Sequence, residues 1–322
     1  MAILAMITKN SWSTRRQVLL EVLNSSLQIP YRALILVDDG DDETGDVVRD
    51  WCDNHGKELV YSRSRLYGHP HPTRATARQT AIDIFLEGFK DEWLMFLDDD
   101  AVLRPGWWEW VEVNKVLEDG AVGEVWGINW DVDPARERLL SLFGLDLKQY
   151  LIRKFEERGG THDTLYRRAA IEGVRIPPEL HVYEDAWLHH WVRCHGWKSV
   201  INPVGVAHYH PMPSLKAEKE KLELAIRAAL KYGICEYEHV RVMAGAASGS
   251  ITAYLSLLRP ILGLVPMLLT CTRAYGVRRG LVEAVKRQYL KLWFRWKVLR
   301  AVKDVERIPD VCEVMRSGEV EE

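Results

Sequence analysis

Residues 93–107, WLMFLDDDAVLRPGW, place three consecutive carboxylates directly after a run of five apolar residues. An uninterrupted apolar run of this length is typical of a strand buried on both faces of a parallel sheet. Like charges in close proximity raise one another's cost of ionisation, so Asp98, Asp99 and Asp100 become favourable together when a divalent cation binds them. We therefore expect an α/β protein with a metal site at this strand end. A solvated turn that caps the next helix is the alternative.

Apolar runs alternate with helical periodicity through the first half of the chain. The pattern predicts strands at residues 2–8, 33–37, 58–62, 93–97 and 122–128, with helices between them at residues 14–28, 43–54, 73–89 and 107–118. A helix at about 184–195 and a strand at 197–206 follow. This alternation indicates a Rossmann-like, doubly wound and mostly parallel sheet, whose ligands should bind beyond the carboxyl ends of the strands.

A second strand end is also acidic. In ALILVDDGDDETGD, residues 33–46, Asp38 and Asp39 follow an apolar run and precede Gly40. The strand-end position favours a ligand-binding role, although Asp-Gly also favours a plain turn. Because side chains alternate in an extended segment, Asp98 and Asp100 should point one way and Asp99 the other.

Four short motifs lie at these strand ends and on the helix predicted at 73–89. They are Ile7-Thr8-Lys9-Asn10, Val37-Asp38-Asp39-Gly40, Ala77-Arg78-Gln79 and Asp98-Asp99-Asp100. Their order and spacing resemble the GT-A fold glycosyltransferases of family 2 over roughly residues 2–210. The third motif departs from the family pattern, since Gln79 stands where the family has Asn.

The resemblance implies an inverting transferase that binds a nucleoside diphosphate sugar and Mn²⁺ or Mg²⁺. It assigns the nucleotide sugar to Thr8, Lys9, Asn10, Asp38, Asp39, Asp98 and Asp99, and the metal to Asp98 and Asp100. Arg74 lies one helical turn before Arg78, so both could face the diphosphate. A surface ion pair is the alternative for Arg78.

A second acidic motif is Glu184-Asp185 in HVYEDAWLHHWVRCHGW, residues 181–197. These acids would favour a helix N-terminus in any case. The family carries a similar pair, which implies that Asp185 is the catalytic base and Glu184 an orienting group on the acceptor side. We expect His189 and His190, further along this helix, to be ordinary surface residues.

His208 and His210 share one face of VGVAHYHPMP, and many GT-A enzymes complete the metal shell with a late histidine. The resemblance therefore implies that one of the two is a metal ligand, and of the two we take His208. A structural or exposed role is the alternative. The stretch GGTHDTLYRRAAIEG, residues 159–173, is similar to the family loop that closes over the donor sugar. Its candidates are His162, Asp163, Arg167 and Arg168. Arg167 or Arg168, of which we take Arg168, could meet a phosphate, and a solvated turn is the alternative.

The C-terminal region combines apolar and basic residues. Residues 251–271 are the most apolar run, but Arg259 and two prolines argue against a simple spanning helix. Residues 273–303 carry ten bases against one acid, while the whole chain has a net charge of −3. A helix at 277–303 would place Leu281, Val285, Leu292, Trp296 and Leu299 on one face, the pattern of a helix lying in an anionic membrane interface. A core-packing helix pair is the alternative, and no nucleic-acid module accompanies the charge.

We therefore expect a catalytic domain at 1–212, a connecting helix at 213–250 and membrane-associated helices at 251–322. The resemblance extends to transferases of the dolichyl-phosphate type. It implies transfer of mannose from GDP-mannose, or of glucose from UDP-glucose. The C-terminal region indicates a lipid-linked acceptor at the cytoplasmic face of the cell membrane, where the protein is monotopic or peripheral, with a spanning segment as the alternative. The Glu184-Asp185 motif departs from the dolichyl-phosphate type, because it is more usual where the acceptor is a sugar hydroxyl, so the acceptor chemistry stays open. The alternatives are a sugar-nucleotide pyrophosphorylase, which should have a Gly-rich phosphate loop after the first strand, and a non-catalytic membrane scaffold.

Overall fold

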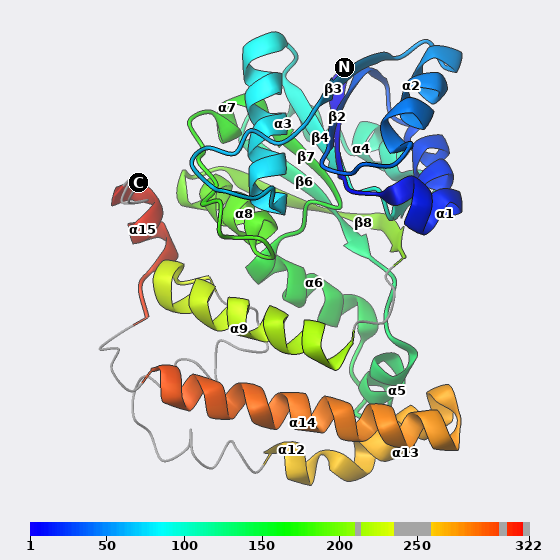
Figure 1. Ribbon diagram of the computed structural model, residues 1–322, viewed down its shortest axis with the longest axis vertical. Coiled ribbons are helices and arrows are strands. Elements are labelled where there is room, and N and C mark those ends of the chain that lie inside the picture. The colour runs from blue at the N-terminus through cyan, green and yellow to red at the C-terminus, as the bar shows by residue number, and fades with distance from the viewer. Residues whose placement is uncertain (210–213, 235–258, 303–307, 318–322) are drawn as a thin grey trace. The chain divides into compact units, whose positions relative to one another are not determined.

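A computed structural model describes residues 1–209, 214–234, 259–302 and 308–317 of the chain (Figure 1). It divides into two compact units. The first contains Met1–Asp131 and residues 159–209, and the second contains Val132–Arg158 and the described residues from 214 onward. We expected residues 132–158 in the catalytic domain, but they group with the C-terminal helices. His210 and residues 251–258 lie outside the described residues.

The first unit is built on one eight-stranded sheet of order β3-β2-β1-β4-β7-β6-β8-β5. Its strands are β1 (Ala2–Thr8), β2 (Tyr31–Asp38), β3 (Glu58–Ser62), β4 (Trp93–Leu97), β5 (Ala101–Leu103), β6 (Val122–Asn129), β7 (Asp163–Arg167) and β8 (Lys198–His208). Only β7 and β5 run antiparallel to their neighbours, and the other pairs are parallel. The expected α/β class is confirmed, with a sheet that is mostly parallel but mixed.

Helices cover both faces of this sheet (Figure 1). On one face α1 (Ser11–Ser26), α2 (Thr44–Asn54) and α4 (Trp107–Val113) share a buried core with the strands. On the other lie α3 (Arg74–Gly88) and α8 (Glu184–Cys194). At the start of α3 the side chains of Thr73 and Thr76 bond each other's backbone N–H groups, which satisfies two of the unpaired donors of a helix end. Layering of this kind leaves the strand ends free to form a site.

The predicted strands and helices of this unit occur within a few residues of their expected bounds, but β5 and β7 were not predicted. β7 is buried throughout, yet it contains Asp163, Thr164 and Arg167. These polar residues hide the apolar run by which a buried strand is recognised. β5 has only three residues, too few to give a pattern.

The second unit consists of helices. They are α5 (Pro134–Leu142), α6 (Leu147–Arg158), α9 (Leu215–Tyr232), α12 (Arg259–Leu262), α13 (Leu264–Tyr275), α14 (Val277–Ala301) and α15 (Val311–Ser317). Ala135 of α5 is fully buried against Met267, Cys271 and Ala284. Arg287 of α14 donates to both carboxylate oxygens of Asp133, the residue that caps α5, at 2.8 and 2.5 Å. These contacts join two stretches of sequence into one unit.

Within the described residues, none of the helices is both long enough and apolar enough to cross a membrane.

The long helix α14 has two apolar stripes. Ala284, Phe294 and Val298 are buried inside the second unit. Four of the five residues that we expected on one apolar face are exposed, with exposed fractions of 46%, 57%, 37% and 44% for Leu281, Val285, Leu292 and Trp296. Leu299 is the exception, because it is partly buried against the core cluster that contains Phe294 and Val298. The core of the unit therefore uses this face only at its C-terminal end.

Candidate active site

The carboxyl ends of β1, β2 and β4 meet at one edge of the sheet, as their parallel pairing requires. Thr8 ends β1, Asp38 ends β2, and the three consecutive aspartates follow β4 directly. β8 reaches the same edge because it pairs with β5, which places His208 opposite Ala101. The short strand β5 thus brings a distant histidine next to the acidic cluster.

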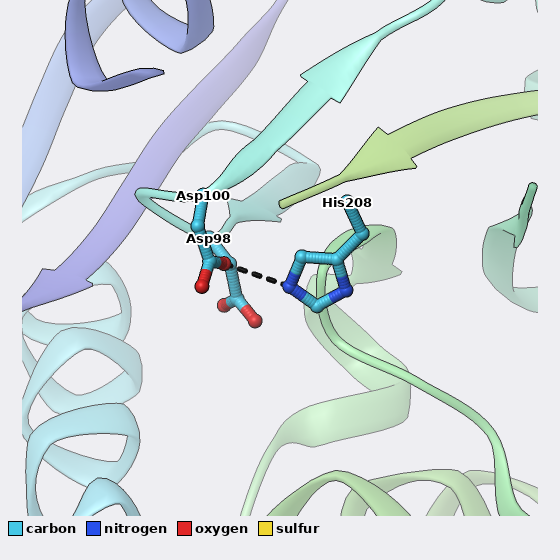
Figure 2. A group of neighbouring side chains, drawn as sticks. All are labelled: Asp98, Asp100 and His208. Atoms are coloured by element: carbon cyan, nitrogen blue, oxygen red, sulfur yellow. Dashed lines mark hydrogen bonds and ion pairs between the residues drawn. The ribbon is translucent and has the colours of Figure 1, made fainter. Parts of the chain in front are cut away.

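Asp98, Asp100 and His208 form a group suited to a metal ion (Figure 2). One ligand atom from each residue lies within 4.8 Å of the other two. The Nε2 of His208 is 2.7 Å from the Oδ1 of Asp100. Two carboxylates and an imidazole are donors that Mn²⁺ accepts, and the carboxylates also suit Mg²⁺. The residues predicted as ligands therefore lie together, and their chemistry fits a divalent cation.

The histidine and aspartate of this group stabilise each other's charge. Burial would lower the pKa of His208, but its hydrogen bond to Asp100 raises it above the ordinary value. Burial would likewise raise the pKa of Asp100, but His208 holds it lower than usual. A cation that binds here must therefore compete with a proton on His208.

Asp99 faces away from the group, as the alternation predicted. Its Oδ2 lies 2.6 Å from the hydroxyl of Thr8 and is also contacted by the hydroxyl of Ser11. Its Oδ1 is 3.5 Å from a guanidinium nitrogen of Arg15. Burial raises the pKa of Asp99, and the positive charge of Arg15 opposes that rise. Asp99 thereby links the loop after β1 to the loop after β4.

Arg78 on α3 joins two acidic groups of the site. Its Nη2 donates to Asp98 at 2.7 Å, and its Nε donates to Glu184 at 3.3 Å. Its side chain is 3% exposed, so it is not the surface ion pair that the sequence left open. Burial alone would raise the pKa of Asp98, but Arg78 and His208 hold it well below its usual range. Removing Arg78 would leave buried carboxylates unpaired, which is strongly destabilising.

Glu184 and Asp185 occupy the first turn of α8, where the helix dipole favours negative charge. Glu184 is buried. Burial and the neighbouring charge of Asp185 raise the pKa of Glu184 to about 7, although Arg78 opposes the rise. Asp185 keeps part of its surface exposed. Asp185 is thus the member of the pair that a solvent-borne molecule can reach.

The loops after β1 and β2 pack tightly against each other. Asn10 adopts a left-handed backbone with φ 57°, and its side-chain oxygen accepts a hydrogen bond from the N–H of Asp41 at 2.8 Å. A Cβ at Gly40 would lie 2.5 Å from the backbone nitrogen of Asn10, so only glycine permits this approach. Asp38 accepts from the N–H of Gly40, and Asp39 from the N–H of Ser64, each at 2.9 Å. Both loops predicted to hold the nucleotide are therefore held in place by hydrogen bonds and by this close approach.

Two basic residues that we predicted to bind the nucleotide sugar, Lys9 and Arg74, lie at this edge with exposed side chains. Arg74 is the first residue of α3, and its charge lowers the pKa of Asp98 alongside that of Arg78. Arg74 is therefore close to the acidic cluster and open to solvent.

Arg168 lies at the opposite end of β4, and its predicted phosphate contact is wrong. Its backbone N–H donates to the carbonyl of Glu92, just before β4 begins, whereas Asp98 follows the end of that strand. Its guanidinium donates to four backbone carbonyls around the end of α3, those of Phe85, Leu86, Phe89 and Asp91. Arg168 thus satisfies carbonyls left over at a helix end.

His189 is buried and is not the surface residue that we expected. Its Nδ1 is 2.5 Å from a carboxylate oxygen of Glu124 on β6. It lies three residues after Ala186 and three before Val192, both buried, and that apolar spacing was the signal that could have placed it on the inner face of α8. The pair anchors α8 to the sheet beneath the acidic first turn.

Asp163 and His162 lie behind the metal group. Asp163 is fully buried, and the indole N–H of Trp107 donates to it at 2.7 Å. Burial raises the pKa of Asp163 to about 7. Burial lowers the pKa of His162 to about 3, and its ring stacks on that of His208 with centroids 5.6 Å apart. The sequence placed both residues in a loop over the donor sugar. In the structure Asp163 begins strand β7 and is bonded to Trp107 and to the N–H of Gly127, and only His162 contacts a residue of the metal group.

Comparison with known proteins agrees with this fold. The family model described as glycosyl transferase family 2 matches residues 4–174. No curated protein matches the chain in sequence. Among solved structures, the mannosyltransferase PcManGT from Pyrobaculum calidifontis, in complex with GDP-Man and Mn²⁺, is 16% identical, with a TM-score of 0.54 over 95% of this chain and 86% of that one. S. aureus TarS 1–349 in complex with UDP-GlcNAc is 15% identical, with a TM-score of 0.50 over 100% and 93% of the two chains. At these identities the likeness shows a shared fold.

Proposed function

The chain belongs to glycosyl transferase family 2, and on that premise we propose that it is an inverting hexosyltransferase that uses a nucleoside diphosphate sugar. The observation that carries the proposal is the buried Arg78. It contacts Asp98 at 2.7 Å and Glu184 at 3.3 Å, so the metal group and the acidic turn of α8 belong to one connected site. A site with a metal group on one side and a carboxylate on the other suits transfer between a donor and an acceptor.

In this proposal Asp98, Asp100 and His208 hold Mn²⁺ or Mg²⁺. A cation bound there neutralises charge that develops on the leaving diphosphate. Thr8, Lys9, Asn10, Asp38 and Asp39 hold the nucleotide at the loops after β1 and β2. Arg74, exposed beside the cluster, binds the diphosphate.

Asp185 is the proposed catalytic base. It accepts the proton of the acceptor hydroxyl while that oxygen bonds to the anomeric carbon and the bond from this carbon to the diphosphate breaks. Attack from the face opposite the leaving group inverts the anomeric configuration. Glu184 is held by Arg78 and is orienting rather than basic, since its raised pKa keeps it partly protonated near neutral pH.

We propose GDP-mannose as the first donor and UDP-glucose as the second. The structural likeness to a mannosyltransferase that binds GDP-Man and Mn²⁺ supports this order. Family membership argues against the pyrophosphorylase alternative, and the complete Asp98, Asp100 and His208 group argues against a non-catalytic scaffold.

The proposed acceptor is lipid-linked, at the cytoplasmic face of the cell membrane. The support comes from the second unit by itself. Its helices α12 to α14 expose large apolar side chains such as Leu262, Val265 and Val282, at 77%, 64% and 64%. An open apolar groove of about 610 Å³ is lined by Leu215, Leu281, Val282, Val285, Lys286 and Tyr289. Exposed apolar side chains among many bases suit an anionic lipid surface, which complements the charge and receives the side chains.

The proposal is tested by supplying each sugar nucleotide with Mn²⁺ to the purified chain, with lipid-linked acceptors in vesicles. Sugar in the lipid extract and released nucleoside diphosphate are measured in parallel, with EDTA and with Asp185→Asn as controls. Metal-dependent transfer with an inverted anomeric configuration is expected. Transfer that persists in EDTA, or a retained configuration, contradicts the proposal.

A further inference from the structure

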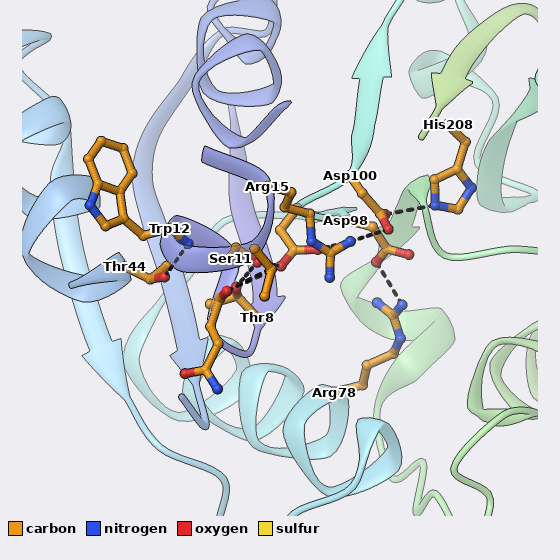
Figure 3. Close-up of polar contacts among 12 residues, drawn as sticks. Thr8, Ser11, Trp12, Arg15, Thr44, Arg78, Asp98, Asp100 and His208 are labelled. Carbon is orange, nitrogen blue, oxygen red and sulfur yellow. Dashed lines mark hydrogen bonds and ion pairs between the residues drawn. The ribbon is translucent and has the colours of Figure 1, made fainter. Parts of the chain in front are cut away.

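The helix α1 is interrupted at Arg15. Within Ser11–Ser26 this residue has φ −151° and ψ 39°, which are not helical angles. The interruption lies where the side chain turns toward the aspartates that follow β4 (Figure 3). Nothing in the helical pattern of the sequence predicts this break, and no motif singled out Arg15.

The guanidinium of Arg15 contacts a carboxylate that is also a candidate metal ligand. Its Nη1 forms an ion pair with Oδ2 of Asp100 and lies 3.5 Å from Oδ1 of Asp99. The other oxygen of Asp100 is 2.7 Å from Nε2 of His208. Arg15 thus supplies positive charge to Asp100 at the edge of the group that would hold a cation.

Two arginines contact these aspartates in the described part of the chain, and they differ in accessibility. Arg78 is 3% exposed and is held between Asp98 and Glu184. Arg15 is 30% exposed, so its guanidinium can turn without unpacking the core. Of the two, only Arg15 is free to exchange one anionic partner for another.

A bound divalent cation would weaken the electrostatic attraction between Arg15 and Asp100. Once Asp100 binds a dication, a guanidinium beside it gains less attraction and meets repulsion from the metal. A nucleoside diphosphate brings new negative charge to the same place, and guanidinium groups bind phosphate oxygens with two parallel hydrogen bonds. The favourable partner for Arg15 then becomes the diphosphate.

We propose that Arg15 pairs with Asp100 in the metal-free protein and turns to the donor diphosphate when metal and nucleotide are bound. The inference rests on the proposed function, because it takes Asp100 as a metal ligand. It gives Arg15 two opposite effects. Arg15 weakens the binding of a metal alone, and it strengthens the binding of a nucleoside diphosphate to the metal-loaded protein.

The test measures two affinities of the full chain with Arg15→Gln. Mn²⁺ alone is titrated and free Mn²⁺ is followed by electron paramagnetic resonance. GDP and UDP are titrated calorimetrically at saturating Mn²⁺. We expect Mn²⁺ to bind about three- to tenfold more tightly, since a partly exposed competing charge is gone. The better-bound nucleotide should bind at least about tenfold more weakly, the loss expected for a charge-assisted hydrogen bond.

The matched control is Arg16→Gln. Arg16 is the next residue, and its guanidinium lies 4.0 Å from the ring centroid of Trp12. It should change neither affinity. Arg15→Lys keeps the charge but loses the planar fork, so it should leave Mn²⁺ binding near wild type and still weaken the nucleotide.

The outcomes separate the two proposals. If the wild-type chain binds no Mn²⁺, the metal site of the proposed function fails. If the wild type binds Mn²⁺ but Arg15→Gln leaves both affinities unchanged, or lowers both, the role of Arg15 is overturned. Circular dichroism and thermal unfolding of each variant identify a folding defect. If Arg15→Gln is misfolded, the nucleotide affinity of Arg15→Lys is the test: weaker binding supports the role of Arg15, and unchanged binding overturns it.

Discussion

Arg78 and Glu184 are 106 positions apart in sequence, yet their side chains meet at 3.3 Å inside the first unit. The contact joins α3 to the first turn of α8, and the same guanidinium reaches Asp98. The buried guanidinium of Arg78 therefore offsets negative charge on both sides of the site. The positions of Asp98 and Asp185 are consequently not independent of each other.

Substitution of Asp100, a member of the metal group, should affect activity more than substitution of Asp99, which faces away from that group. Asp100→Ala should lower kcat/KM by about 100-fold or more and abolish Mn²⁺-dependent nucleotide binding, because a metal ligand is lost. Asp99→Asn should be milder, since Asp99 bonds to Thr8 and Ser11 on the other side. Steady-state kinetics and calorimetry measure both. Normal turnover of Asp100→Ala would remove the metal assignment.

Asp185→Asn should reduce kcat by about 10²–10⁴-fold and leave donor affinity unchanged, because a general base acts in the transition state. Glu184→Gln should have a smaller effect on kcat, since Glu184 is already partly protonated near neutral pH. Single-turnover rates and donor binding are measured separately. A loss of donor binding without a loss of rate in Asp185→Asn indicates a structural residue instead.

Burial of Asp163 should make stability depend on pH. Its pKa rises from 3.8 to about 7 on folding, so between those values the folded state holds a proton that the unfolded state releases. This contribution is fully present below pH 3.8 and is lost as pH rises toward 7. In EDTA, wild-type unfolding free energy should fall more steeply over this window than that of Asp163→Asn. Asp119→Asn is the control. The pKa of this carboxyl is lowered, so Asp119 titrates below the pH window in which Asp163 releases its proton.

Gly40→Ala should destabilise the chain by ~1–3 kcal/mol, the usual cost of a forced steric overlap, and weaken nucleotide binding. The added methyl group would meet the backbone of Asn10 at 2.5 Å. Gly120→Ala is the control, since a Cβ there meets nothing within 4 Å. Chemical denaturation and GDP titration measure the two effects. Equal behaviour of the two variants contradicts the close approach of the loops.

The exposed apolar side chains of α12 to α14, which include Leu262 and Trp296, should bind anionic vesicles. Leu262→Glu and Trp296→Ser should each reduce binding to vesicles that contain anionic lipid, and high salt should weaken wild-type binding because it screens the bases of α14. Val113→Glu, at a site 73% exposed on α4 of the first unit, is the matched control. Vesicle sedimentation measures the bound fraction. Oligomerisation through the same side chains without any vesicle binding sinks the membrane proposal.

Much of the first unit could be predicted because buried parallel strands leave uninterrupted apolar runs in the sequence, as in β1 and β4. The acidic ends of β2 and β4 were visible for the same reason. Arg15 could not be found, because a helical pattern does not reveal one non-helical residue within it. Arg168 was misplaced because sequence does not show that β7 runs antiparallel to β4, which carries its end away from the cluster. His189 was misjudged because its polarity was weighed more than its spacing from the apolar residues Ala186 and Val192.

The pairing of Asp133 with Arg287, and the burial of Ala135 beside α13, bear on how this protein can be divided by genetic means. The second unit is encoded by two stretches, 132–158 and the residues after 210, with part of the first unit between them. A stop codon before residue 259 would strip α5 of the helices that cover Ala135 and would leave Asp133 without its guanidinium partner. The C-terminal helices are therefore not an exchangeable cassette. Recombination that swaps the C-terminal helices between homologues must carry residues 132–158 with them.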